Sequence, residues 1–306
     1  MLANKYQLLE KLSQGSFGKV FKASNIRTGE IVAIKTEVKT KEQKSLKMEA
    51  KIYQYLANND GFPQLKWFGS TNNVNFLVTN LLECSITKLV QKYGRLSVKT
   101  VLLLGIQMIE RIQTLHNHYL IHRDIKPDNF MINISDKTNK IYLIDFGFCK
   151  RYNHDGVHIE FKRPTSLIGT PNYVSLNVHN GAEPSRRDDI ESCLYIMIYM
   201  LFGKFFSTET NSDNSNLSPG PNLSAQKILI LKKEQLTNIP RFLVTAFNYV
   251  RTIKFEEEPD YQYIIRIFTD LLLEQKRLNG ENKHKENEDD DDKDDDEDDE
   301  ETYEWS

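Results

Sequence analysis

Hydrophobic and polar residues alternate in short runs along the N-terminal part of the chain. The first run, starting at Tyr6, is "YQLLEKL", and it is followed by "KVFKAS" and "EIVAIKTE". The residues "RTGE" supply a turn between the second run and the third. Alternation with a period of two residues is typical of half-buried β-strands. The pattern therefore predicts an antiparallel meander, and the runs "WFGS" and "VNFLVTNLL" predict two more strands.

A helical period replaces this alternation between Lys41 and Leu56. Leu46, Ala50, Tyr53 and Ala57 recur at a spacing that would put them on one face of a helix. The segment is predicted to be the main helix of a small lobe.

Beyond Glu83 the pattern is mainly helical. The run "SVKTVLLLGIQMIERIQTLHNHYL" predicts a long amphipathic helix, and "DDIESCLYIMIYMLF" is apolar nearly all round, which predicts a buried helix. A polar loop rich in Asn, Ser and Pro follows over residues 203–224. Helical periodicity resumes at Ala225 and fades near Arg277.

This order of elements predicts an α+β fold with two lobes. We expect a small antiparallel-sheet lobe with one main helix over residues 1–82 and a larger, mainly helical lobe over residues 83–277. Residues 278–306 are expected to form a disordered acidic C-terminal tail.

Composition favours an intracellular protein, cytoplasmic and/or nuclear. The N-terminus "MLANKYQLLEKL" has charges among its apolar residues, which does not suit a secretory segment. The longest apolar run, from Cys193 to Phe202, is about half a membrane span. Cys84, Cys149 and Cys193 are far apart and show no metal-type spacing, so they are expected to be small buried residues in a reducing compartment.

Charge is distributed unevenly along the chain. Residues 286–301 read "ENEDDDDKDDDEDDEE", which is fourteen acids and one lysine. This segment carries −13, and subtracting it from the net charge of −3 leaves +10 for the rest of the chain. A basic body attracts phosphates, acidic peptides or nucleic acid alike.

The segment "LIHRDIKPDNFMI", starting at Leu120, carries a dense set of polar side chains between apolar flanks. A buried strand would not tolerate these groups, so we expect a loop anchored by its flanks. The loop supplies Asp124, Lys126 and Asn129, and Asp145 follows the predicted strand "IYLID". Asn129 and Asp145 offer hard oxygen ligands for Mg²⁺.

Asp124 could accept a proton from a hydroxyl, and Lys126 could neutralise charge on a transferred group. Capping or turn roles would explain one Asp but not this ordered set.

Two further features lie in the N-terminal lobe. In "SQGSFGKV", Gly15 and Gly18 would let the backbone approach a phosphate chain closely, although glycines in a hairpin are more often only a turn. Lys35 ends "IVAIK", and Glu49 follows fourteen residues later on the inward helix face. Glu49 could hold a phosphate-binding Lys35 in place, whereas the alternative is two unrelated surface charges.

Together these motifs resemble the protein kinase signature, from about Tyr6 to about Arg277. Within that superfamily the chain resembles the casein kinase 1 family in "HRDIKPDNFMI", "YLIDFGFCK", "LIGTPNYVS", "SRRDDIES" and "FEEEPDYQYI", and in reading "VSLN" where most protein kinases have "APE". The resemblance implies the two-lobed protein kinase fold and a serine/threonine protein kinase that uses ATP and Mg²⁺. The alternative is a pseudokinase scaffold that binds partners without transferring phosphate.

The resemblance also implies roles for particular residues. Asp124, Lys126, Lys35 and Glu49 would be catalytic, and Asn129 and Asp145 would hold Mg²⁺. The residues implied to bind the nucleotide are Leu12, Ser13, Gln14, Gly15, Ser16, Phe17, Gly18, Lys19, Val20, Ala33, Lys35 and Leu82. Those implied to contact the substrate are Thr170, Asn172 and Lys227. Asp189 would hydrogen-bond the catalytic loop from beneath, and Thr79 would be the gatekeeper beside the adenine.

Two positions depart from the family pattern. Ser13 replaces the first glycine of the nucleotide loop, which should restrict its backbone and could weaken ATP binding. Asn172 stands where the family has an arginine that reads an upstream phosphate or acid, and replacing a guanidinium with an amide removes charge and geometry together. We therefore expect weaker dependence on phosphate-primed substrates.

The expected partners are acidic or phosphorylated protein substrates of a monomeric enzyme. The basic body alone would also suit a nucleic-acid-binding module, but no recognition motif supports specific nucleic-acid binding, and no membrane association is expected. The acidic tail, with Thr302 three residues after Asp299, could compete for the substrate groove in cis or be phosphorylated. The alternative is a solubilising appendage.

Overall fold

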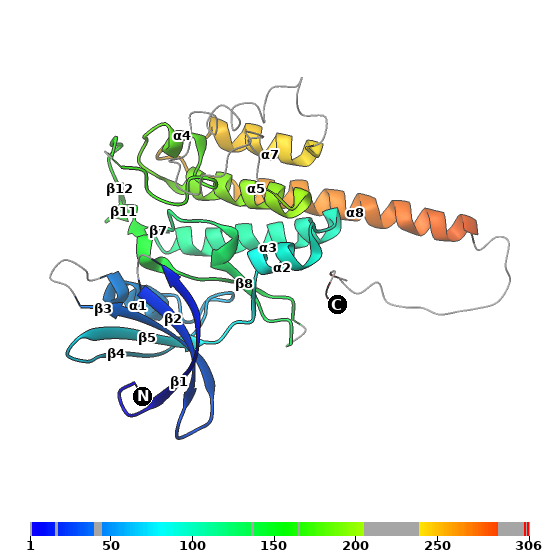
Figure 1. Cartoon of the computed structure of the whole chain (residues 1–306). Helices are drawn as coiled ribbons and strands as arrows, with labels where there is room; N and C mark the ends of the chain where they lie inside the picture. The colour runs from blue at the N-terminus through cyan, green and yellow to red at the C-terminus, as the bar shows by residue number, and fades with distance from the viewer. Residues whose placement is uncertain are drawn as a thin grey trace, which may run out of the picture.

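The protein has a small lobe of strands and a larger lobe of helices (Figure 1). The structure, a computed structural model, describes residues 2–15, 18–39, 45–135, 138–164, 166–204, 239–286, 303 and 305. The two-lobed architecture predicted from the order of elements is confirmed within these residues.

The small lobe contains a five-stranded antiparallel sheet in the order β1-β2-β3-β5-β4. Its elements are β1 (Tyr6–Gly15), β2 (Gly18–Asn25), β3 (Ile31–Val38), β4 (Leu65–Ser70), β5 (Val74–Asn80) and the helix α1 (Ser45–Tyr55). The first three strands form the predicted meander, and the two later strands are confirmed as well.

Strand register separates the two faces of this sheet. Val20 lies opposite Lys35, and Lys35 lies opposite Leu77, so these three side chains share one face. Leu77 belongs to the main hydrophobic core, which places this face toward α1 and the large lobe. The other face buries a smaller cluster of Tyr6, Ala23, Val32, Ile34, Phe76 and Val78.

Helix α1 buries Leu46, Ala50 and Tyr53, as its helical period predicts. The prediction for Ala57 is wrong, because the helix ends at Tyr55 and Ala57 is exposed. The following residues, "NNDG", favour turns, and Gly61 has φ +77°, which a continuing helix would not allow.

The large lobe is built from helices and short strands. The helices are α2 (Ile86–Tyr93), α3 (Val98–Asn117), α4 (Leu176–His179), α5 (Arg186–Phe202), α7 (Arg241–Thr252) and α8 (Tyr261–Glu286). The strands are β6 (Cys84–Ser85), β7 (Leu120–Ile121), β8 (Phe130–Ile132), β9 (Ile141–Leu143), β10 (Lys150–Arg151), β11 (Asn153–His154) and β12 (Val157–His158), with 3₁₀ turns η1 (Pro127–Asn129) and η2 (Phe146–Phe148).

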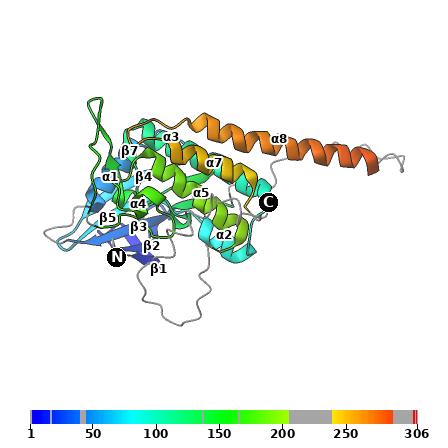
Figure 2. The ribbon, with the colours of Figure 1, turned by 90° about the horizontal axis from the view of Figure 1, so that it is seen from above.

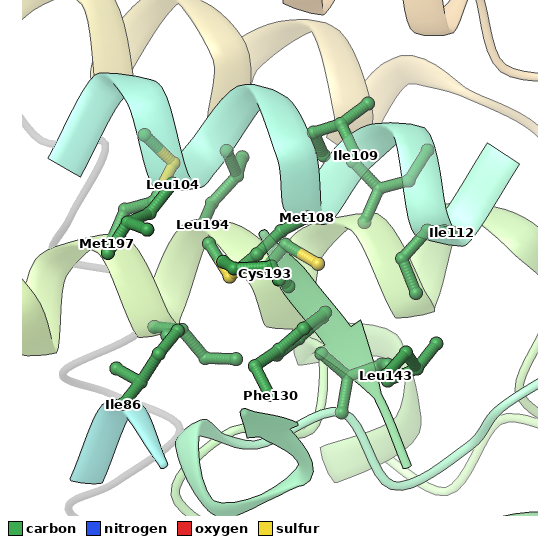
Figure 3. Packing of buried hydrophobic residues seen from close by; sticks show 14 of the residues in the cluster. Ile86, Leu104, Met108, Ile109, Ile112, Phe130, Leu143, Cys193, Leu194 and Met197 are labelled. Atoms are coloured by element: carbon green, nitrogen blue, oxygen red, sulfur yellow. The ribbon is translucent and has the colours of Figure 1, made fainter. Parts of the chain in front are cut away.

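The centre of this lobe is the contact between α3 and α5. Figure 3 shows Met108 of α3 beside Cys193 and Leu194 of α5, with Phe130 of β8 close to them. Gly105 permits the approach, since a Cβ there would lie 2.5 Å from the Cε atom of Met197. Because α5 is buried nearly all round, as predicted, it gives the loop that follows β7 a rigid support.

The expected tail boundary is corrected at two places. Helix α8 runs on to Glu286 and extends past the other helices (Figure 2), although the helical period fades near Arg277. At Leu278, which is 54% exposed, the helix no longer packs an apolar face on the core, so the fading of the apolar period marks the end of that packing and not the end of the helix. Near the C-terminus Tyr303 is only 6% exposed, and Trp305 packs against the same core, so these two residues are not part of a disordered tail.

Candidate active site

Three charged side chains from different elements meet beneath the small sheet. Lys35 Nζ, on β3, lies 2.8 Å from Glu49 Oε2 of α1 and 2.7 Å from Asp145 Oδ1, which follows β9. The predicted pairing of Lys35 with Glu49 is therefore confirmed. Lys35 Nζ is shared between the two carboxylates.

Burial sets the protonation behaviour of this cluster. Desolvation raises the pKa of Glu49 to about 7, although the positive charge of Lys35 acts to lower that pKa. Burial also acts to raise the pKa of Asp145, but the charge and hydrogen bond of Lys35 outweigh it and hold that pKa below its ordinary value. Asp145 is therefore an anion at neutral pH.

The backbone around Asp145 is fixed by its neighbours. Asp145 has φ +64°, a left-handed conformation that Asp tolerates better than most residues, and its carboxylate accepts a hydrogen bond from Gly147 N–H. Phe146 is buried, with its ring centroid 4.8 Å from that of Tyr53 and 5.7 Å from that of His122. This packing directs the Asp145 carboxylate toward Lys35.

The predicted loop at Leu120 carries a second cluster around Asp124. Asp124 is buried, and its Oδ1 accepts a 2.7 Å hydrogen bond from the Thr170 hydroxyl. Lys126 Nζ lies 2.8 Å from Asp124 Oδ2, and Asn129 Nδ2 donates to the Asp124 carbonyl oxygen at 2.8 Å. The loop thus brings together a carboxylate, an ammonium group and an amide.

Asp189 of α5 supports this loop from below. Its Oδ2 accepts from His122 N–H at 2.7 Å and its Oδ1 from Arg123 N–H at 2.9 Å, which confirms the contact predicted for it. Arg123 needs this support, because its φ of +69° is unfavourable for a side chain of its size.

His116 of α3 completes the support of Asp189. Its Nε2 lies 3.0 Å from Asp189 Oδ2, and its Nδ1 lies 2.8 Å from the Tyr261 hydroxyl. Burial lowers the pKa of His116, although Asp189 opposes the shift. A neutral ring that donates from Nε2 and accepts from the Tyr261 hydroxyl satisfies both contacts.

Gly169 is a functional position that the residue-by-residue reasoning missed. It has φ +100°, and a Cβ there would lie 2.6 Å from the Arg123 carbonyl oxygen. Only glycine lets this segment pass so close to the loop and deliver Thr170 to Asp124. The signal was the glycine immediately before that threonine in "GTPNY".

The segment "VSLN", residues 174–177, is anchored by α5. The Ser175 hydroxyl donates to Asp188 Oδ1 at 2.5 Å, and the Leu176 N–H donates to Glu191 Oε1 at 3.1 Å. Glu191 also forms an ion pair with Arg251 of α7. The acidic anchor therefore comes from α5, a position that sequence reasoning did not single out.

The predicted nucleotide loop lies where β1 turns into β2. Leu12, Ser13, Gln14 and Gly15 end β1, and Gly18, Lys19 and Val20 begin β2, whereas Ser16 and Phe17 lie outside the described residues. Gly18 has φ +128°, and a Cβ there would lie 1.8 Å from the Thr36 carbonyl oxygen. Gly18 is therefore required by the sheet itself. Ser13 pairs with Val20 in extended backbone, which serine adopts without strain.

The remaining predicted residues lie in both lobes or outside the described residues. Ala33 lies opposite Thr79 in the sheet, and Leu82, just beyond β5, is buried. Asn172 has an exposed side chain. Lys227 lies outside the described residues.

The donor atoms at the site fit a magnesium ion. No hydrogen bond between described residues uses Asn129 Oδ1 or Asp145 Oδ2. Both are hard oxygen atoms, which Mg²⁺ prefers. Among the described residues no group of three or more His, Cys, Asp or Glu could hold a metal. A two-ligand site suits Mg²⁺, which takes its other ligands from substrate phosphates and water.

Comparison with known families agrees with this geometry. The family model for the protein kinase domain matches residues 6–264, which includes both clusters. Over the described ranges, none of the helices is both long and apolar enough for a membrane span.

Proposed function

The chain belongs to the protein kinase family, and from this membership we propose that it is a serine/threonine protein kinase of the casein kinase 1 type. Its proposed reaction moves the γ-phosphoryl group of ATP to Ser or Thr of acidic protein substrates. The observation that carries the proposal is the buried Asp124 carboxylate, which accepts a hydrogen bond from a threonine hydroxyl at 2.7 Å.

We propose that a substrate hydroxyl approaches the same Asp124 carboxylate that accepts the Thr170 hydroxyl. In the proposed reaction, Asp124 takes the proton of the substrate hydroxyl while that oxygen attacks the γ-phosphorus. The bond between the γ-phosphorus and the bridging oxygen breaks, and ADP leaves. Lys126, 2.8 Å from Asp124, is placed to offset charge on the transferred group.

The cluster of Lys35, Glu49 and Asp145 would bind the nucleotide. Lys35, held by Glu49, would bind the phosphates of ATP. Asn129 and Asp145 would hold Mg²⁺, which supplies charge neutralisation for the β- and γ-phosphates when bound. The alternative of a scaffold without phosphotransfer depended on Ser13, and its extended backbone gives that alternative no support.

The substrate class is proposed from charge. The segment leading to Thr170 carries Lys162 and Arg163 with exposed side chains, which favours acidic or phosphorylated protein substrates. Asn172 provides no positive charge where the resemblance expects an arginine, so we propose that priming by phosphate is not required. We further propose that the protein is a monomer. We also propose that it acts inside the cell, in cytoplasm and/or nucleus, which its three free cysteines favour.

Phosphoamino acid analysis of dephosphorylated casein after incubation with the protein and Mg-ATP tests the proposed specificity. We expect phosphoserine and phosphothreonine, and phosphotyrosine as the main product would contradict the proposal. Matched acidic peptides with and without an upstream phosphoserine test the substrate class. Similar rates are expected, and a large gain from priming would refute the role given to Asn172.

A further inference from the structure

Tyr303 and Trp305, close to the end of the chain, pack against residues of the large lobe that belong to neither charged cluster. Their rings stack with centroids 4.9 Å apart and an interplanar angle of 27°. The Tyr303 hydroxyl lies 3.4 Å from Gln107 Nε2 of α3, and the Trp305 indole N–H donates to Asn139 Oδ1 at 2.9 Å. Figure 1 marks the C-terminus on this side of the lobe.

The body fixes Gln107 independently of the C-terminus. Gln107 Nε2 donates to the Asn139 carbonyl oxygen at 3.0 Å, and Gln107 Oε1 accepts from Ile141 N–H at 2.9 Å. An amide nitrogen carries two hydrogens, so one remains for the Tyr303 hydroxyl. The donor is therefore held in place before any aromatic residue binds.

Asn139 is held by the turn between β8 and β9. Its φ of +49° is left-handed, a conformation that Asn adopts more readily than most residues. The next residue, Lys140, forms a 2.7 Å ion pair with Asp60, which follows α1. The Asn139 carbonyl oxygen accepts from Gln107 of α3, so the backbone of the acceptor for Trp305 is attached to that helix.

We propose that α3 and the β8–β9 turn form a docking site for a Tyr-x-Trp motif, and that its occupant is the C-terminus of the same chain. The chemistry recognised is two aromatic rings one residue apart, each with one polar group, and such rings bury a large area with little loss of entropy. None of the residues assigned to catalysis, nucleotide or substrate belongs to this site.

The sequence between α8 and the motif contains most of the acidic run. Helix α8 ends at Glu286, so sixteen residues, 287–302, join it to Tyr303. A tether of this length keeps the motif at a high effective concentration, on the order of millimolar, near its site. An acidic partner with a Tyr-x-Trp motif would have to compete with this tethered end.

Peptide binding tests the docking site. The labelled probe is a peptide of residues 298–306, "DDEETYEWS", titrated by fluorescence polarisation into a chain that ends at residue 302. We expect saturable binding, and at least about 30-fold weaker binding of a peptide in which both aromatic residues are alanine. Asn139→Gly, which keeps the left-handed turn, should weaken binding about fivefold. The same change at exposed Asn180 on the end of α4 is the control and should have no effect.

The full-length chain tests occupancy in cis. It should bind the labelled peptide at least about tenfold more weakly than the truncated chain, because its own C-terminus competes. In a Trp67→Phe background, Trp305 is the only tryptophan. Quenching of its fluorescence by acrylamide should increase when Asn139→Gly is added. A folded truncated chain that does not bind the peptide would overturn the docking site. Equal binding by both chains, or a dimer that requires Tyr303 and Trp305, would overturn docking within one chain.

Discussion

Asp189→Asn is the change that separates support of the catalytic loop from the chemistry itself. The Asp189 carboxylate accepts backbone hydrogen bonds from His122 and Arg123 and a third from His116. An asparagine amide has only one oxygen acceptor in place of two. Its NH₂ group would therefore face one of the N–H donors, which would lose its hydrogen bond. The substitution leaves the chemical identity of Asp124 unchanged, so any effect on catalysis comes from the position of the loop.

The contacts set the size of the effect. Losing a hydrogen bond to a buried charge and leaving a donor unsatisfied costs about 3–5 kcal/mol. A folded domain is stable by about 5–15 kcal/mol, so the variant should still fold at low temperature. The loop then loses what holds Arg123 at φ +69°, and a shift of about 1 Å at Asp124 lowers kcat about 100-fold.

Urea unfolding and steady-state kinetics with Mg-ATP and casein measure both effects. We expect a kcat that falls while the KM for ATP changes little, because the Lys35 cluster is not altered. Asp270→Asn, the same change at an exposed position on α8, is the control and should change stability by less than about 0.5 kcal/mol. Wild-type stability and kcat in Asp189→Asn would refute the reasoning.

Three other changes test separate parts of the account. Gly169→Ala should destabilise the protein by about 1–3 kcal/mol in urea unfolding, because φ is +100° and the new Cβ meets the Arg123 carbonyl; an unchanged midpoint would contradict this. Asn172→Arg should raise the preference for a primed over an unprimed peptide about tenfold in kcat/KM, whereas an unchanged ratio would show that this position does not read phosphate. Burial raises the pKa of Glu49 from 4.5 to about 7, so its contribution to stability is present below pH 4.5 and is lost as pH rises through 7. Glu49→Gln should remove this decline from a pH series of unfolding midpoints, and a wild-type contribution that grows over the same range would contradict the assignment.

The sequence predicted those parts of the fold whose hydrophobic pattern is typical of only one kind of secondary structure. Period-two alternation gave the meander, and the apolar run gave the buried helix α5. The contact of Asp189 with the catalytic loop followed from the resemblance, because a charge at the start of such a helix needs a partner.

The missed features depend on contacts between distant residues. Glu191 of α5 anchors the start of α4 only because the fold brings the Leu176 N–H beside it, and the spacing of residues in the sequence does not reveal this. Trp305 follows a run of acids that predicts disorder, and its partner Asn139 lies 166 residues earlier. Neither Gln107 nor Asn139 belongs to a motif, so the docking site could be found only from the folded chain.

The most direct test of the central claim is phosphate transfer from Mg-ATP to dephosphorylated casein, with wild type compared against Asp124→Asn. The matched control is Asp128→Asn, the same change at an exposed position four residues along the same loop. We expect transfer by wild type and Asp128→Asn and a loss of at least about 100-fold in Asp124→Asn, since Asp124 accepts the substrate proton. A folded, ATP-binding wild type that transfers no phosphate, or an Asp124→Asn variant as active as wild type, would contradict the account.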